Sequence, residues 1–241
     1  MFWGRAIAKT TALVGGAMVL ALSGAAHAGT VVASSGPSAS QFPRGKKLAD
    51  TDRITLKEGD SVTILDAKGT RVLTGPGTRV VGAPGTPNQA KFAMLTRQRS
   101  AVRARTGAIR GDQSSTVPSI WYVDVGRSGT MCLADASVVR LWRAESKGIA
   151  NYSVAAPSGA TVNVLFDDSV DVALWDTQQL PLASDTQYTI KGPGGVPESK
   201  VTFALIETVP QEPEELAAAL IEKGCNAQLD ILSAGMATPQ G

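Results

Sequence analysis

Apolar and polar residues alternate along the first part of the chain. The runs at residues 53–56, 61–65 and 70–74 each repeat with a period of two, and turn residues separate them. This pattern is typical of short strands with one buried face, each of which needs its neighbours for stability. An apolar pair, Val31-Val32, precedes them and suggests an edge strand. We therefore expect residues 29–92 to form a β-meander.

A second alternating stretch begins at Ser119. Its apolar runs recur at intervals of about ten residues, which is the spacing of a sandwich or barrel. We expect residues 112–241 to form a β-sandwich, with Trp121, Trp142 and Trp175 as core anchors. The expected strands are residues 120–125, 130–133, 138–142, 151–154, 161–166, 171–175, 187–190 and 201–207.

Two segments change to a helical period. The pairs at 94–95, 101–102 and 108–109 predict an amphipathic helix over residues 93–111 that connects the two β regions. Residues 213–224 predict a second helix, with Pro213 in its first turn and Gly224 as its stop, that closes the sandwich. The fold class is therefore mainly β: a β-meander, a connecting helix, and a C-terminal β-sandwich closed by an α-helix.

The first 28 residues have the pattern of a secretory signal peptide. Arg5 and Lys9 precede an apolar run at residues 11–23, and Ala26-His27-Ala28 has small residues before an expected cut after Ala28. The run is shorter than the roughly 20 residues of a membrane-spanning helix, although an uncleaved signal anchor remains the alternative. We expect a soluble periplasmic protein without a transmembrane segment after cleavage.

His27 is the single histidine of the chain, so the mature protein would contain none. This excludes a Ser-His-Asp triad, a Cys-His pair and a histidine metal site, and we expect neither metal nor cofactor. Four carboxylates could still form an acid–base pair, although their alternation with apolar residues is typical of solvated strand ends. They are Asp167, Asp168, Asp171 and Asp176. We expect a non-enzymatic protein, with an Asp-dependent hydrolase of envelope polysaccharide as the alternative.

The chain contains two cysteines, Cys132 and Cys225. In an oxidising compartment they are expected to form one disulfide, and the chain-entropy value for closing so long a loop is about 4–5 kcal/mol, often less in practice. Two buried free thiols are the alternative. A disulfide would attach the C-terminal helix to the second β region.

Charge divides the chain after residue 111. Residues 29–111 contain 14 Lys and Arg against 5 Asp and Glu, whereas residues 112–241 contain 7 against 16. Either the two halves dock and neutralise each other, or the basic half faces an anionic membrane surface, polysaccharide or protein. Nucleic acid is not an expected partner in the periplasm. The arginines proposed to bind the anion lie along the connecting helix: Arg97, Arg99, Arg103, Arg105 and Arg110.

Residues 42–48, 52–56, 59–62 and 69–73 form a series of short segments with a strand-turn-strand rhythm. Through these segments, residues 42–77 resemble the FecR-type periplasmic domain. The resemblance implies a β-rich extracytoplasmic module that makes protein or envelope contacts, with no catalytic residues to carry over, and the remainder is similar to exported bacterial proteins with such a domain. FecR regulators also contain a cytoplasmic anti-sigma segment and a membrane span, and this sequence shows neither. An accessory to a membrane signalling receptor is a further alternative.

Overall fold

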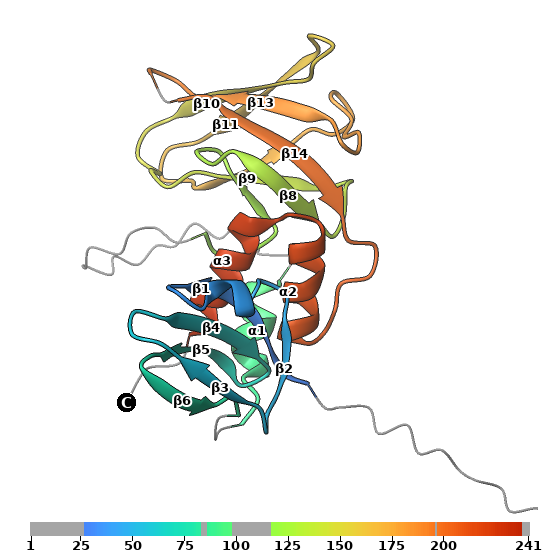
Figure 1. Cartoon of the computed structure of the whole chain (residues 1–241). Coiled ribbons are helices and arrows are strands. Elements are labelled where there is room, and N and C mark those ends of the chain that lie inside the picture. The colour runs from blue at the N-terminus through green and yellow to red at the C-terminus, as the bar shows by residue number, and fades with distance from the viewer. Residues whose placement is uncertain (1–26, 83–85, 98–116, 196, 238–241) are drawn as a thin grey trace, which may run out of the picture.

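Two β units lie on either side of a layer of helices (Figure 1). The computed structural model describes residues 27–82, 86–97, 117–195 and 197–237. Within these residues the fold is mainly β, as predicted. Most of the predicted signal peptide, residues 1–28, lies outside the described residues.

The N-terminal β unit (residues 27–82) contains two antiparallel sheets. One has the strand order β2-β1-β4-β5, and the other pairs β3 with β6. The strands are β1 (His27–Ser35), β2 (Lys47–Ala49), β3 (Arg53–Leu56), β4 (Ser61–Asp66), β5 (Gly69–Thr74) and β6 (Gly77–Val80). Alternate residues of each strand face a small core that includes Ile54, Leu56, Val62 and Ile64.

Two predictions for this unit need correction. The strands expected to form one meander divide between two sheets, because β3 pairs with β6, a strand that was not predicted after the Gly75-Pro76-Gly77 break. The expected edge strand is an interior one, because β1 lies between β2 and β4. Val31 faces the core of the N-terminal unit and Val32 faces the helices, so both faces of β1 are buried.

The C-terminal β unit contains a five-stranded sheet (β11-β10-β13-β14-β8) packed on a three-stranded sheet (β12-β9-β7). All eight predicted strands are present with small shifts at their ends. They are β7 (Tyr122–Asp124), β8 (Gly129–Leu133), β9 (Val139–Trp142), β10 (Ala150–Ala155), β11 (Thr161–Phe166), β12 (Val172–Trp175), β13 (Gln187–Lys191) and β14 (Ser199–Leu205). The sandwich-like arrangement is confirmed, and Trp121, Trp142 and Trp175 are all buried. Of the three, Trp175 belongs to the core between the two sheets, whereas Trp121 packs in the apolar cluster of the C-terminal helices.

The C-terminal helices, α2 (Pro213–Glu222) and α3 (Asn226–Gly235), form a layer between the two β units (Figure 1). We call these two helices the helical layer. The sequence predicted a helix that closes the sandwich alone. Instead, α2 packs against β1 and β4 of the N-terminal unit, while α3 contacts β8 of the C-terminal unit. The apolar cluster around Leu216 and Leu220 includes Val32 and Leu65 from one side and Trp121 from the other.

The observed helix has different limits from the one predicted over residues 93–111. Helix α1 (Gln89–Leu95) begins earlier, because the Asn88 side chain accepts a hydrogen bond from the Lys91 N–H and caps the helix. It ends at Leu95, followed by Thr96, whose hydroxyl bonds to the Phe92 carbonyl. The remainder of the predicted helix, residues 98–111, lies outside the described residues. In the described part of the chain, no helix has the length and apolar character needed to span a membrane.

A disulfide joins Cys132 of β8 to Cys225 at the start of α3, as predicted. Beside it, the buried Gln228 side chain accepts a hydrogen bond from the Cys132 N–H and donates to the Cys132 carbonyl. It also donates to the Ile120 carbonyl. A side-chain amide thus takes the place of a neighbouring strand along this edge of β8, and the helical layer is attached to the C-terminal unit both covalently and by hydrogen bonds.

Candidate functional site

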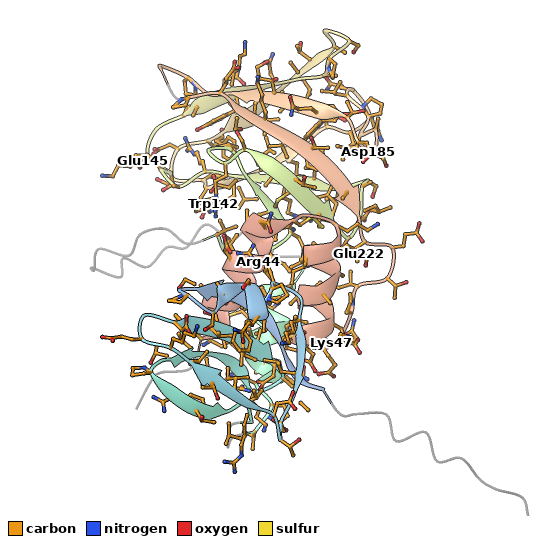
Figure 2. The ribbon with its side chains drawn as sticks, viewed as in Figure 1. Arg44, Lys47, Trp142, Glu145, Asp185 and Glu222 are labelled. Atoms are coloured by element: carbon orange, nitrogen blue, oxygen red, sulfur yellow. A yellow bond between two sulfur atoms is a disulfide. The ribbon has the colours of Figure 1, made fainter. Side chains whose placement is uncertain are left out.

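Exposed cationic side chains occur throughout the N-terminal half of the described chain. Residues 27–97 contain ten Lys and Arg against five Asp and Glu. We call seven of these cations, all exposed, the basic surface: Arg44, Lys46, Lys47, Arg53, Lys57, Arg79 and Arg97. Figure 2 shows Arg44 and Lys47 on the N-terminal unit, whereas the labelled carboxylates Glu145 and Asp185 lie on the C-terminal unit.

Arg44 and Lys46 of the basic surface lie in the connection between β1 and β2, and Lys47 follows it. Gly45 adopts a left-handed conformation (φ 90°) that lets the chain turn back, and its N–H donates to the Val31 carbonyl at 2.8 Å. The Lys46 ammonium donates to the Gln41 carbonyl and lies 5.0 Å from the centre of the Phe42 ring. Lys47 opens the edge strand β2 and is exposed. The backbone thus fixes where these charges emerge.

Asp60, which is buried, holds this connection against the turn before β4. Its carboxylate accepts hydrogen bonds from the Ser38 N–H at 2.8 Å and from the Lys57 N–H. Burial alone would raise the pKa of Asp60, but these hydrogen bonds and the nearby Lys57 charge hold the pKa below its ordinary value. Gly36 is required here, because a Cβ at this position would lie 2.6 Å from the Asp60 carboxylate.

The basic surface is not neutralised by the acidic half. The ion pairs shown by the described residues are Arg71–Asp66, within the N-terminal unit, and Lys191–Glu198, within the C-terminal unit. No member of the basic surface has a carboxylate within 4.0 Å in the described part of the chain.

The polar contacts between the halves are hydrogen bonds. Arg44 donates to the Asn226 side chain at 2.8 Å, and the Lys91 ammonium donates to the Ala237 carbonyl at 2.7 Å. Gln89 donates to the Glu212 carboxylate at 3.1 Å. Among the described residues, the halves therefore dock through the apolar helical layer without pairing their opposite charges.

Of the five arginines predicted to bind an anion, Arg97 is exposed just beyond α1. The other four, Arg99, Arg103, Arg105 and Arg110, lie outside the described residues. Sequence reasoning did not single out the cations around Gly45, although the run Arg44-Gly45-Lys46-Lys47 was a visible signal.

Two of the aspartates considered for acid–base catalysis stabilise turns through their carboxylates. Asp168 accepts a hydrogen bond from the Gly148 N–H, and Asp176 accepts one from the Gln178 N–H. A hydrogen bond from the Gln179 side chain, followed by the Gln178 N–H, lowers the pKa of Asp176.

Asp171 and Asp176 do not form a close pair. They lie at opposite ends of β12, about 16 Å apart along an extended strand. Glycosidase carboxylates lie about 5–9.5 Å apart. Asp167 contributes its backbone carbonyl, as a hydrogen-bond acceptor for Arg143.

Arg143 is a buried cation that the sequence did not reveal. It lies 5.1 Å from the Phe166 ring centre. Its guanidinium donates to four backbone carbonyls, those of Ser146, Gly148, Asp167 and Val170. These bonds tie the β9–β10 and β11–β12 loops together, so the charge stabilises the fold.

Two pockets lie beside the helical layer. A pocket of about 20 Å³ between β8 and α3 has room for about one water molecule. A shallower one of about 430 Å³ lies between the end of β14 and α2, bordered by Glu207, Glu222 and Lys223. Neither is lined by the four aspartates, and the described residues contain no group of three or more Cys, His, Asp or Glu suited to a metal ion.

Comparison with known proteins gives no relative. No protein-family model, no curated protein and no solved structure matches the chain. The FecR-type resemblance therefore stays a prediction from the sequence.

Proposed function

We propose that this chain is a non-enzymatic binding or scaffold protein of the bacterial cell envelope. In this proposal, the basic surface of the N-terminal unit binds an anionic envelope component, and the C-terminal unit supports it. Export to the periplasm follows from the predicted signal peptide.

The observation that supports this proposal is that the described residues of the two halves form no ion pair with each other. Two halves of opposite charge that bury an interface could place their charges in pairs. Here the interface is apolar, with Val32, Leu65 and Phe92 packed among the leucines of the helical layer. The cations stay exposed, which is the state in which they attract an anionic partner.

Two further features support the compartment. The Cys132–Cys225 disulfide is buried and typical of an oxidising environment. Cleavage after Ala28 would remove the first two residues of β1, and would keep its pairing with β4 from Thr30 onward. The mature chain would therefore retain the pairing of β1 with β4.

Charge reversal on matched surfaces tests the proposed function. The exported protein is incubated with vesicles of mixed anionic and zwitterionic lipid and with an anionic polysaccharide, and bound protein is measured by co-sedimentation. Each Lys or Arg near an anionic surface contributes about 1 kcal/mol. Lys47→Glu combined with Arg53→Glu should therefore weaken binding by at least roughly tenfold, and salt should weaken binding of the native protein.

Lys147→Glu combined with Lys200→Glu is the matched control. Both lysines are exposed, and both belong to the C-terminal unit. The pair changes the net charge equally, so a response to overall charge alone would affect both variants alike. Equal losses in the two variants would contradict the proposed site, and failure to bind either anionic material would contradict the proposed class of partner.

A further inference from the structure

We propose that the outer edge of β11 is a self-association surface, at which a second copy of this chain adds its own β11 in antiparallel orientation. This inference is independent of the proposed anionic partner. It rests on how the edge strands of the described sheets are protected.

An edge strand offers unpaired backbone N–H and C=O groups, and natural proteins protect such edges by shortness, charge or a covering element. Most edge strands of the described sheets follow this rule. β2 and β7 have three residues each and include Lys47 and Asp124, and β12 has four residues between two aspartates. β3 and β6 contain Arg53 and Arg79.

The two longer protected edges are also partly covered. On β8, the Gln228 side chain bonds to the backbone of Cys132. On β5, which contains Arg71, the chain after α3 forms a bridge from Ala237 to Thr70. Each edge therefore has a covering group or a charge.

β11 is less protected: Asp167 and Asp168 follow its last residue and β12 packs near it, but the strand itself contains no charge. It pairs with β10 over six consecutive residues without a bulge, and no described strand pairs with its other side. Its six residues include no charged residue and no proline, and residues 149–166 as a whole contain no charged residue. Leu165 is 58% exposed and Ile149 is 70% exposed on this hairpin.

The strand is complementary to itself. In an antiparallel pair, directly opposed residues lie on the same face of the sheet. Pairing about Asn163 places Val162 opposite Val164 of the second copy, so that core-facing valines meet across the junction. It also places the exposed Leu165 opposite Thr161 of the second copy. The two five-stranded sheets would then form one continuous sheet with two-fold symmetry.

Charge favours a second copy in this orientation. Residues 117–207 contain 10 acidic against 6 basic residues, so two C-terminal units repel each other through their net negative charge. The two units can approach each other at the β10–β11 hairpin, which carries no charge. Antiparallel pairing about Asn163 brings Asp167 of one copy opposite Gly159 of the other, away from the second copy's own Asp167 and Asp168. A parallel arrangement would bring these carboxylates together.

Sedimentation velocity of the exported protein over a range of concentrations tests the inference. The native protein is expected to form a dimer. Asn163→Lys puts two cations opposite each other at the two-fold axis and should raise the dimer dissociation constant at least about fivefold. Gln187→Lys is the matched control, because Gln187 is exposed on the interior strand β13, and it should leave the dimer unchanged.

Crosslinking gives a second, positive readout. Asn163→Cys should form a disulfide between copies under oxidising conditions, and Gln187→Cys should not. A native protein that stays monomeric at every concentration would overturn the inference. A dimer that Asn163→Lys leaves intact, or that Gln187→Cys crosslinks equally well, would also overturn it. If Asn163→Lys changes the circular dichroism spectrum, Leu165→Lys replaces it as the test variant.

Discussion

The two β units differ in how they are stabilised. The C-terminal unit has an aromatic core, in which the Trp175 ring lies 5.0 Å from Tyr188 and 5.7 Å from Phe203, measured between ring centres. The core of the N-terminal unit is aliphatic, with Phe42 as its aromatic member, and its edges are basic. The unit proposed to bind therefore has the smaller core of the two, and it gains further burial from the helical layer.

The helical layer is also attached differently to the two units. A disulfide and the Gln228 hydrogen bonds fix it to the C-terminal unit. Apolar contacts and a few hydrogen bonds, such as that from the Thr70 N–H to the Met236 carbonyl, hold it to the N-terminal unit. We therefore expect the N-terminal unit to separate first when the protein is destabilised.

Truncation of one core aromatic in each unit should have the largest effect. Trp175→Ala and Phe42→Ala should each cost about 3–5 kcal/mol. Trp175→Ala should destabilise both units, because the C-terminal unit anchors the helical layer. Phe42→Ala should open the N-terminal unit and leave the near-ultraviolet circular dichroism of the C-terminal tryptophans in place. Loss of that signal in both variants would show that the two units unfold as one.

Removal of the disulfide should have the next largest effect. Replacing Cys132 and Cys225 by Ser should lower the free energy of unfolding by about 2–4 kcal/mol. Amide hydrogen exchange should accelerate in α2, α3, β1 and β4, and little in β10 to β14. Acceleration confined to the C-terminal sheets would contradict the assigned role of the bridge.

Gln228→Leu should have an intermediate effect. It leaves the backbone N–H and C=O of Cys132 buried without the side-chain amide, at a cost of about 1–3 kcal/mol. Chemical denaturation measures this loss. Asn226→Ala, on the same helix, removes an exposed hydrogen bond to Arg44 and serves as the control, with an expected loss below about 1 kcal/mol. Equal losses of stability in the two variants would contradict the role assigned to Gln228.

Substitution of Glu214 should change the stability of the protein least, and the size of the change should depend on pH. Burial, followed by the charges of Glu212, Asp66 and Glu215, raises the pKa of Glu214, which lies at the start of α2. The folded protein therefore holds this proton more tightly than the unfolded chain, and stability falls as pH rises above the ordinary pKa of 4.5.

Glu214→Gln should remove this part of the pH dependence and raise the melting temperature at neutral pH by no more than about 2–4 °C. Melting curves of both proteins at several pH values provide the measurement. A variant that is less stable than the native protein at neutral pH would contradict the assigned direction of the pKa shift.

The local alternation of residues predicted the strands well, and the long-range pairing poorly. The residues of β11 were predicted to the residue, because each buried position alternates with an exposed one. Alternation gives no information on the partner of a strand, so the pairing of β3 with β6 was missed. The position of the helical layer between two units was also missed, because a buried stripe on a helix does not identify the surface that covers it.

The sequence predicted the basic character of the candidate site but only part of its location. The charge division indicated a basic region, but only Arg97 of the proposed arginines is among the described residues. The cations near Gly45 depend on a turn whose geometry is set by Asp60 and Gly36, contacts that link separate parts of the sequence. Arg143 was missed because the sequence does not distinguish a buried arginine from an exposed one.

Hydrogen–deuterium exchange of the exported protein, with and without anionic vesicles, tests the central claim most directly. We predict slower exchange on binding in residues 44–57 of the N-terminal unit, reversed by added salt, with exchange in residues 150–205 unchanged. Protection confined to the C-terminal unit, or binding that leaves residues 44–57 unaffected, would contradict the account.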